Sequence, residues 1–258
     1  MKYETLDVTI TDAVMTVVLN RPEKKNAMGP TTLSELHSVL DDNDRSKDVR
    51  VLILTGSGDS FTAGADIKTL AVNRADDPTL YYQEYKYMLS LQEKLRLFPK
   101  ATIAAVNGWC LGWGMWIVSV CDFAIASKKA KLGHPQVGMG AMPSGGAIKG
   151  NLDLLPHRDA LYYLLTGEML SPEVAERLRL VNYVVEHDDL MPQAMELAGK
   201  LKDKDPVVVA AIKHAFWREK YLSYTDGLDL EYMQATEALR HQGEFYPAGF
   251  KDFREEHS

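Results

Sequence analysis

The residues with the clearest chemical potential are at positions 107–116, where glycines and tryptophans stand between two apolar runs. The apolar run at 101–106 is typical of a buried strand, and the run at 117–121 is typical of a buried helix. A glycine turn between a strand and a helix start can aim backbone N–H groups at a developing negative charge. Trp113 and Trp116 are three residues apart, so on a helix they share one face. This pattern predicts an anion-stabilising site with indole walls.

The elements that must position this stretch alternate between strands and helices. The pattern predicts a hairpin from 8–10 and 14–19, strands at 51–55, 101–106 and 123–126, and helices at 31–40 and 77–98. This alternation predicts an α/β fold with a parallel sheet. From residue 156 onward the pattern is mainly helical, at 158–166, 172–178, 188–201, 206–217 and 225–241, with a short apolar piece at 183–185.

Composition excludes some classes of partner and predicts a compartment. The chain has 258 residues and a net charge of −7, which argues against nucleic acid as the main partner. We expect no membrane partner, because no apolar run is long enough to span a bilayer. The first residues do not resemble a signal peptide, and Cys110 and Cys121 lie in apolar surroundings. These features predict two buried thiols in a reducing compartment, and hence a cytoplasmic location.

Several segments resemble a known family, in the same order along the chain. They are residues 20–27, 52–56, 61–68, 103–108, 121–126, 165–168 and 180–182. Together they resemble the crotonase superfamily of enoyl-CoA hydratases and isomerases. Trp109-Cys110, His157-Arg158, residues 161–163 and residues 249–253 are most similar to the hydroxycinnamoyl-CoA hydratase-lyases of that superfamily.

The resemblance implies a spiral of ββα turns at 1–200 that binds an acyl-CoA, followed by a helical trimerisation region at 201–258. It implies a homotrimer or a hexamer made of two trimers, with no cofactor other than the coenzyme A of the substrate. It also implies that the backbone N–H groups of Ala65 and Trp113 hold the thioester oxygen. Substrate-binding positions implied or inferred for this chain are Lys25, Ala27, Ala63, Asp66, Ile67, Lys68, Tyr85, Gly112, Trp116, Tyr232 and Phe253.

The chain departs from the family at the two positions that carry catalytic glutamates in hydratases. These positions hold Trp116 and Gln136 in this sequence. Glutamine can hold a water by hydrogen bonds but cannot take its proton at neutral pH. Loss of a general base usually costs on the order of 10²–10⁴ in rate. The sequence therefore predicts either different chemistry or a base elsewhere.

Four residues are alternatives for that base or for the acyl pocket. His134 has an intrinsic pKa suited to base catalysis, although a structural role in its loop is the alternative. Ser144 stands where related dehalogenases have a nucleophile, but a helix N-cap is the expected role for a serine without a base partner. Glu84 lies on a stretch that lines the acyl pocket in relatives, and a solvated helix position is the alternative. Tyr232 lies on a late helix that approaches the site of a neighbouring subunit in the lyases.

Three functions follow from these observations. The first is an enzyme that transforms an acyl-CoA through a thioester enolate, with a planar aromatic or alicyclic acyl group against the indoles. The second is hydrolysis of a C–C bond in a cyclic β-diketone. The third is a non-catalytic relative that binds acyl-CoA.

Overall fold

A six-stranded sheet forms the centre of the computed structural model, which describes residues 3–69 and 78–241. Its strands run in the order β1 (Leu6–Thr11), β2 (Val14–Leu19), β3 (Val51–Gly56), β5 (Ala101–Val106), β7 (Phe123–Ser127) and β9 (Tyr183–Val185). β1 and β2 form the expected antiparallel hairpin, with Asp12 and Ala13 at positive φ in its turn. All other neighbours in this sheet are parallel, which confirms the predicted α/β class.

A second sheet of three short parallel strands accompanies the first. It comprises β4 (Ser60–Thr62), β6 (Trp109–Leu111) and β8 (Lys131–Gly133). Each of these strands follows a strand of the large sheet, and α4 (Trp113–Val120) then follows β5 and β6. The family resemblance predicts a ββα spiral, and its repeating unit is a long strand, a short strand and a helix, as found here.

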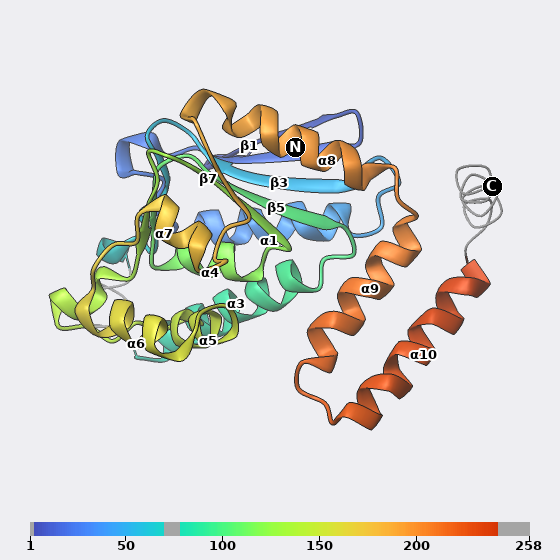
Figure 1. Cartoon of the computed structure of the whole chain (residues 1–258). Helices are drawn as coiled ribbons and strands as arrows, with labels where there is room; N and C mark the ends of the chain where they lie inside the picture. The colour runs from blue at the N-terminus through green and yellow to red at the C-terminus, as the bar shows by residue number, and fades with distance from the viewer. Residues whose placement is uncertain (1–2, 70–77, 242–258) are drawn as a thin grey trace.

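Helices cover both faces of the large sheet because both faces carry apolar side chains. Leu52 and Leu54 of β3 belong to the main core, which is shared with α1 (Pro30–Asn43), α3 (Pro78–Arg96) and α4. Ile53 between them points to the opposite face and packs with Leu190 and Ala194 of α8 (Leu190–Lys202). Figure 1 shows α8 on one side of the sheet and α1 and α4 on the other. Successive side chains of one strand thus point to opposite faces of the sheet and belong to two separate hydrophobic cores.

Shorter helices continue the chain beside α4. They are η2 (Pro135–Met139), α5 (Ala147–Leu154), α6 (His157–Thr166) and α7 (Pro172–Arg177), with η1 (Pro22–Lys24) and η3 (His187–Asp189) elsewhere. α9 (Pro206–Glu219) and α10 (Tyr224–His241) form a hairpin that projects from the rest of the molecule (Figure 1). Among the described helices, none is long and apolar enough to cross a membrane.

A buried ion pair ties the projecting hairpin to the sheet. Lys213 of α9 is 8% exposed, and its Nζ lies 2.7 Å from Asp122 Oδ2 and 2.7 Å from the carbonyl oxygen of Lys100. The same Asp122 oxygen accepts hydrogen bonds from the Thr102 backbone N–H at 2.8 Å and the Thr102 hydroxyl at 2.9 Å. The carboxylate and the ammonium therefore each have an opposite charge and further hydrogen-bond partners, which offset the cost of burying them.

Candidate active site

The site is built where the segment after β4 meets the start of α4. Gly64 has φ +95°, and a Cβ on it would lie 2.6 Å from the carbonyl oxygen of Leu111 and 3.2 Å from the backbone nitrogen of Trp113. Only glycine allows this approach, which brings the Gly64–Ala65 peptide against the first residue of α4. Within the described residues, the backbone N–H groups of Ala65 and Trp113 donate no hydrogen bond. Two free donors at a helix start form an arrangement that can stabilise an oxyanion.

Gln136 lies beside Gly112, the residue that precedes the Trp113 amide. Its Nε2 is 3.0 Å from the position that a Cβ would take on Gly112, the residue before Trp113. Its Oε1 is buried and has no hydrogen-bond partner within the described part of the chain. The carboxamide therefore keeps its hydrogen-bonding capacity for a ligand or a water molecule. An unpaired buried polar atom costs about 1–3 kcal/mol, and Trp116 Nε1 and His134 Nδ1 are likewise buried without a partner within the described residues.

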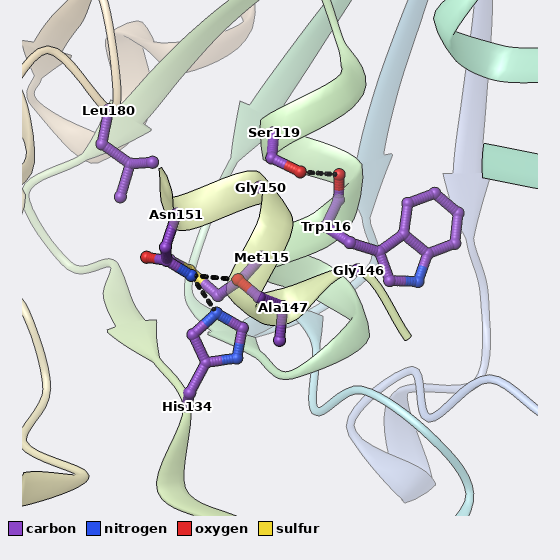
Figure 2. Close-up of a pocket in the computed structure, with 9 residues that line it drawn as sticks. All are labelled: Met115, Trp116, Ser119, His134, Gly146, Ala147, Gly150, Asn151 and Leu180. Atoms are coloured by element: carbon purple, nitrogen blue, oxygen red, sulfur yellow. Dashed lines mark hydrogen bonds between the residues drawn. The ribbon is translucent and has the colours of Figure 1, made fainter. Parts of the chain in front are cut away.

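His134 lines a small cavity between α4 and α5, shown in Figure 2. Its Nε2 accepts a hydrogen bond from Asn151 Nδ2 at 2.9 Å, and Asn151 Nδ2 also donates to the carbonyl oxygen of Ala147 at 2.7 Å. Burial lowers the pKa of His134 to about 4. His134 is 2% exposed, the lowered pKa keeps its ring neutral at pH 7, and its Nδ1 is buried without a hydrogen-bond partner within the described residues. These contacts favour the structural role over the catalytic role that we also considered for His134.

Trp116 lies in the protein core. The side chain is 2% exposed, and its ring packs among apolar side chains of β2, β3, α1 and α3. Figure 2 shows the indole pointing away from His134 and Asn151. The expectation that Trp113 and Trp116 form one wall is therefore wrong for Trp116. The helix begins at Trp113 itself, so Trp113 stands at the end of α4 while Trp116 faces the sheet.

Trp113 is the indole that borders the site. Its ring is half-buried, and its Nε1 lies 3.4 Å from the position that a Cβ would take on Gly145. A Cβ on Gly145 would also lie 2.9 Å from Met88 Cε, and Gly145 has φ +67°. Gln92 Nε2 donates to the carbonyl oxygen of Gly145 and so fixes this glycine turn against α3. Tyr85, one turn earlier on α3, is half-buried against the main core. The Trp113 ring and Met88 therefore meet at the Gly145 turn.

Two lysines and Trp109 form a positively charged patch near the segment that leads to Ala65. Lys25 Nζ is 4.9 Å and Lys131 Nζ is 4.6 Å from the centre of the Trp109 ring. Both lysines are exposed, and Lys25 has φ +49°. The carbonyl oxygen of Lys25 accepts the N–H of Ala63 at 2.8 Å, so the turn is tied to the segment that leads to Ala65. The patch offers two ammonium groups to an anionic ligand next to the candidate oxyanion site.

The other expected binding residues occupy varied positions. Asp66 is partnered, because its Oδ2 lies 3.3 Å from Arg21 Nη1, which also donates to the carbonyl oxygen of Ala27 at 2.7 Å. Ile67 and Lys68 are exposed beside Asp66. Tyr232 is 75% exposed on α10, which lies apart from α4 (Figure 1). Phe253 and the side chain of Glu84 lie outside the described residues.

The interpretation of Ser144 as a helix N-cap is wrong. Gly146 is the N-cap of α5, and no side chain caps that helix. Sequence reasoning also missed Met88, Gln92 and Asn151. Met88 and Gln92 are four residues apart, a spacing that places both on one face of the predicted helix. Their contacts with Gly145 could not be inferred, because the fold brings together segments more than fifty residues apart.

A metal centre has no support in the described part of the chain. None of its groups of histidine, cysteine, aspartate and glutamate side chains could hold a metal ion. Cys110 and Cys121 are buried free thiols, as expected, and burial raises the pKa of Cys121 to about 12. The site therefore offers backbone donors, one carboxamide and apolar walls.

Comparisons with known proteins match most of the length of this chain. The family model for enoyl-CoA hydratase/isomerase matches residues 9–258. A hydroxycinnamoyl-CoA hydratase-lyase from Pseudomonas fluorescens is 36% identical over 251 residues, which cover 94% of this chain and 91% of that protein. A short-chain-enoyl-CoA hydratase from Clostridium acetobutylicum is 36% identical over 207 residues, which cover 80% and 78%.

Solved structures share the whole architecture. The crystal structure of an enoyl-CoA hydratase from Bacillus anthracis superposes with a TM-score of 0.90 at 28% identity, covering 98% of this chain and 97% of the other. That of an enoyl-CoA hydratase from Polaromonas sp. JS666 gives a TM-score of 0.91 at 27% identity, with 97% of each chain covered. The similarity spans both sheets and the helical part that follows them.

Proposed function

The chain belongs to the enoyl-CoA hydratase/isomerase family and is an enzyme of that type, and from this premise we propose that it transforms an acyl-CoA through a thioester enolate. The observation that supports the proposal best is the pair of N–H groups at Ala65 and Trp113, which donate no hydrogen bond within the described residues and are brought together by the close approach of Gly64. An enolate oxygen between them gains two hydrogen bonds and the positive end of α4. One such donor is typically worth about 3–4 kcal/mol in the barrier.

The acyl group that we propose is planar, either aromatic or alicyclic. Since Trp116 lies in the core, this part of the proposal depends on Trp113, with Met88 and Tyr85 nearby. An indole face prefers a flat partner, and an aromatic pair adds about 0.5–1.5 kcal/mol beyond the buried area. Such a group should therefore bind about two- to tenfold more tightly than a short alkyl chain.

The anionic end of coenzyme A would lie near the lysines. We propose Lys25 and Lys68 as partners of its phosphates, with Lys131 as an additional cation near the Trp109 ring. The backbone of Lys25 is hydrogen-bonded to Ala63, and Lys68 lies three residues after Ala65. These positions suit a ligand whose thioester lies at Ala65.

The oligomer that we propose is a trimer or a pair of trimers. The α9–α10 hairpin projects from the sheet core (Figure 1) and exposes large apolar side chains, namely Ile212, Phe216, Leu228, Tyr232, Met233 and Leu239. Apolar side chains on a projecting element are typical of an interface. Tyr232 would then approach the site of a neighbouring subunit. Sedimentation velocity tests the assembly, and a monomer at micromolar concentration would contradict it. The cytoplasmic location and the absence of a further cofactor stay predictions.

Calorimetric titration and a turnover assay with the same ligands test the function. We expect 4-coumaroyl-CoA to bind more tightly than butyryl-CoA and both to bind more tightly than free coenzyme A. Trp113→Leu should remove the preference for the planar group. Trp109→Leu is the matched control, because it should change the affinity for both ligands by the same factor.

The outcomes separate the three candidate functions. Binding without turnover of any acyl-CoA would favour a non-catalytic relative. Turnover of a cyclic β-diketone that lacks coenzyme A would favour the C–C hydrolase. No binding of any acyl-CoA at millimolar concentration would refute the proposed function.

A further inference from the structure

The short helix η2 carries Gln136 but buries little of its own surface. Each of its residues is half-buried or exposed. Val137 packs close to Gly167, where an added Cβ would lie 2.8 Å from Val137 Cγ1. The Gln136 carboxamide nevertheless lies close to the backbone of Gly112. A segment with so little buried surface opens easily, so it needs a further support to hold one side chain in one place.

The residue that precedes η2 supplies such a support. His134 is the N-cap residue of η2 and is 2% exposed. Its Nε2 lies 2.9 Å from Nδ2 of Asn151, a buried residue of α5. Figure 2 shows the two side chains pointing toward each other. This buried contact ties the start of η2 to α5.

The contact between Asn151 and His134 works in one direction only. Asn151 Nδ2 also lies 2.7 Å from the carbonyl oxygen of Ala147, and a carbonyl oxygen can only accept a hydrogen bond. The carboxamide must therefore present its amino group to both partners, and His134 Nε2 must be the acceptor. The proton of the neutral ring is then on Nδ1. Any replacement at position 134 must offer an acceptor to keep this contact.

The helix that holds His134 also begins at the turn that borders Trp113. α5 starts at Ala147, directly after Gly145 and Gly146. A Cβ on Gly145 would lie 3.4 Å from Trp113 Nε1, and the carbonyl oxygen of Gly145 accepts a hydrogen bond from Gln92 of α3. The position of η2 is thus set by a helix that is itself held beside the start of α4.

Resting on the proposed function, we propose that Asn151 and His134 are positioning residues for Gln136. They hold the Gln136 carboxamide beside Gly112, where its Nε2 donates a hydrogen bond to the thioester end of a bound acyl-CoA. Neither positioning residue touches the ligand. Without their contact the carboxamide would occupy several positions and lose part of that hydrogen bond.

A double-mutant cycle tests this relation, with 4-coumaroyl-CoA as the ligand in calorimetric titration. Gln136→Leu should weaken binding about two- to tenfold, which is the usual value of one hydrogen bond. Asn151→Leu has a side chain of similar size without the amino group, and it should weaken binding by a similar factor. The double variant should bind no more weakly than Gln136→Leu alone, because Asn151 acts through Gln136. A merely structural role of Asn151 would give two independent factors that multiply.

Variants at position 134 test the polarity of the contact. His134→Leu removes the acceptor and should weaken binding as Asn151→Leu does. His134→Gln provides a carboxamide oxygen as acceptor and should recover most of the affinity lost in His134→Leu. If Asn151→Leu does not fold, as judged by urea unfolding, His134→Leu takes its place in the cycle with Gln136→Leu.

Asn43→Leu is the matched control. Asn43 at the end of α1 donates to the carbonyl oxygen of Val39, four residues earlier, at 2.8 Å. The replacement removes the same kind of hydrogen bond that Asn151 makes with Ala147, but on another helix. It should leave the affinity for 4-coumaroyl-CoA unchanged.

The outcomes separate this inference from the proposed function. A double variant that binds like Gln136→Leu, together with the recovery in His134→Gln, supports the inference. If 4-coumaroyl-CoA binds but the two factors multiply, or if Asn151→Leu or Gln136→Leu keeps the parent affinity, the inference is overturned while the proposed function stands. Equal weakening in His134→Leu and His134→Gln would also overturn it. If no acyl-CoA binds at millimolar concentration, both fail.

Discussion

His134 should make the stability of the protein fall on acidification. Burial lowers its pKa from 6.5 to about 4 in the folded state. Between these values the unfolded chain binds a proton that the folded chain does not bind. Folding therefore loses stability as the pH falls through 6.5 toward 4, and no loss is expected above about pH 7. For these two pKa values the loss between about pH 7.5 and about pH 5 is about 2 kcal/mol from this one group.

The variant His134→Gln isolates this contribution. Glutamine can still accept the hydrogen bond from Asn151 but cannot take up a proton. Urea unfolding at several pH values measures the free energy of unfolding for both proteins. The variant should lose about 2 kcal/mol less than the parent protein over this pH range. His157→Gln is the matched control, because His157 is exposed and its replacement should leave the pH dependence unchanged.

The same titration distinguishes the two roles of His134. A catalytic base with an ordinary histidine pKa would give the parent protein and His134→Gln the same pH dependence of stability. Its removal would instead lower the turnover rate by about 10²–10⁴. Equal slopes in the two proteins would therefore refute the structural role.

Three further predictions concern the packing that forms the site. Gly64→Ala should lower kcat by about 10²–10³, because its methyl group would displace the Trp113 amide from the oxyanion. Gly199→Ala is the control and should leave kcat unchanged, because nothing lies within 4 Å of the position of its Cβ. The same kcat in the parent protein and in Gly64→Ala would contradict the role of the close approach. Lys213→Met should lower the free energy of unfolding, measured in urea, by about 3–5 kcal/mol, because it removes the partner charge of the Asp122 carboxylate. Lys200→Met, which removes an exposed ion pair, should lower it by less than about 1 kcal/mol. Equal losses in the two variants would show that the Lys213–Asp122 pair does not stabilise the fold. Gly145→Ala should push the Trp113 ring and Met88 apart and reduce the preference for binding 4-coumaroyl-CoA over butyryl-CoA in calorimetry. Gly138→Ala is the control, because nothing lies within 4 Å of the position of its Cβ. An unchanged preference in Gly145→Ala would show that this turn does not line the acyl pocket.

Periodicity was sufficient for the long elements and insufficient for the short ones. The strand predicted at 101–106 agrees with β5, because it is an apolar run between clear breaks. Residues 183–185, predicted only as a short apolar piece, form the three-residue strand β9. The strands β4, β6 and β8 have three residues each, which is too short for an alternating pattern to be visible. They are stabilised by pairing with each other, and this pairing depends on the spiral rather than on local sequence.

In the candidate site, too, the features set by local sequence could be predicted, and those set by the tertiary fold could not. The glycine turn before Trp113 predicts a helix start with free amides, because the local sequence determines where a helix begins. The direction of Trp116 could not be predicted from its spacing to Trp113. Spacing shows that two side chains share a helix face, but not whether that face meets a sheet or a ligand. The fold turns this part of α4 toward β2 and β3, and Trp116 fills the core.

The central claim is that two backbone amides hold the thioester oxygen, and the carbonyl stretch of a bound acyl-CoA tests it most directly. Isotope-edited difference infrared spectroscopy of an acyl-CoA with a ¹³C-labelled thioester carbonyl measures that band free and bound. Two hydrogen bonds from the Ala65 and Trp113 amides should weaken the C=O bond and shift the band to lower frequency. Gly64→Ala should reduce the shift. A bound band at the frequency found in water, in a protein saturated with ligand, would contradict the account.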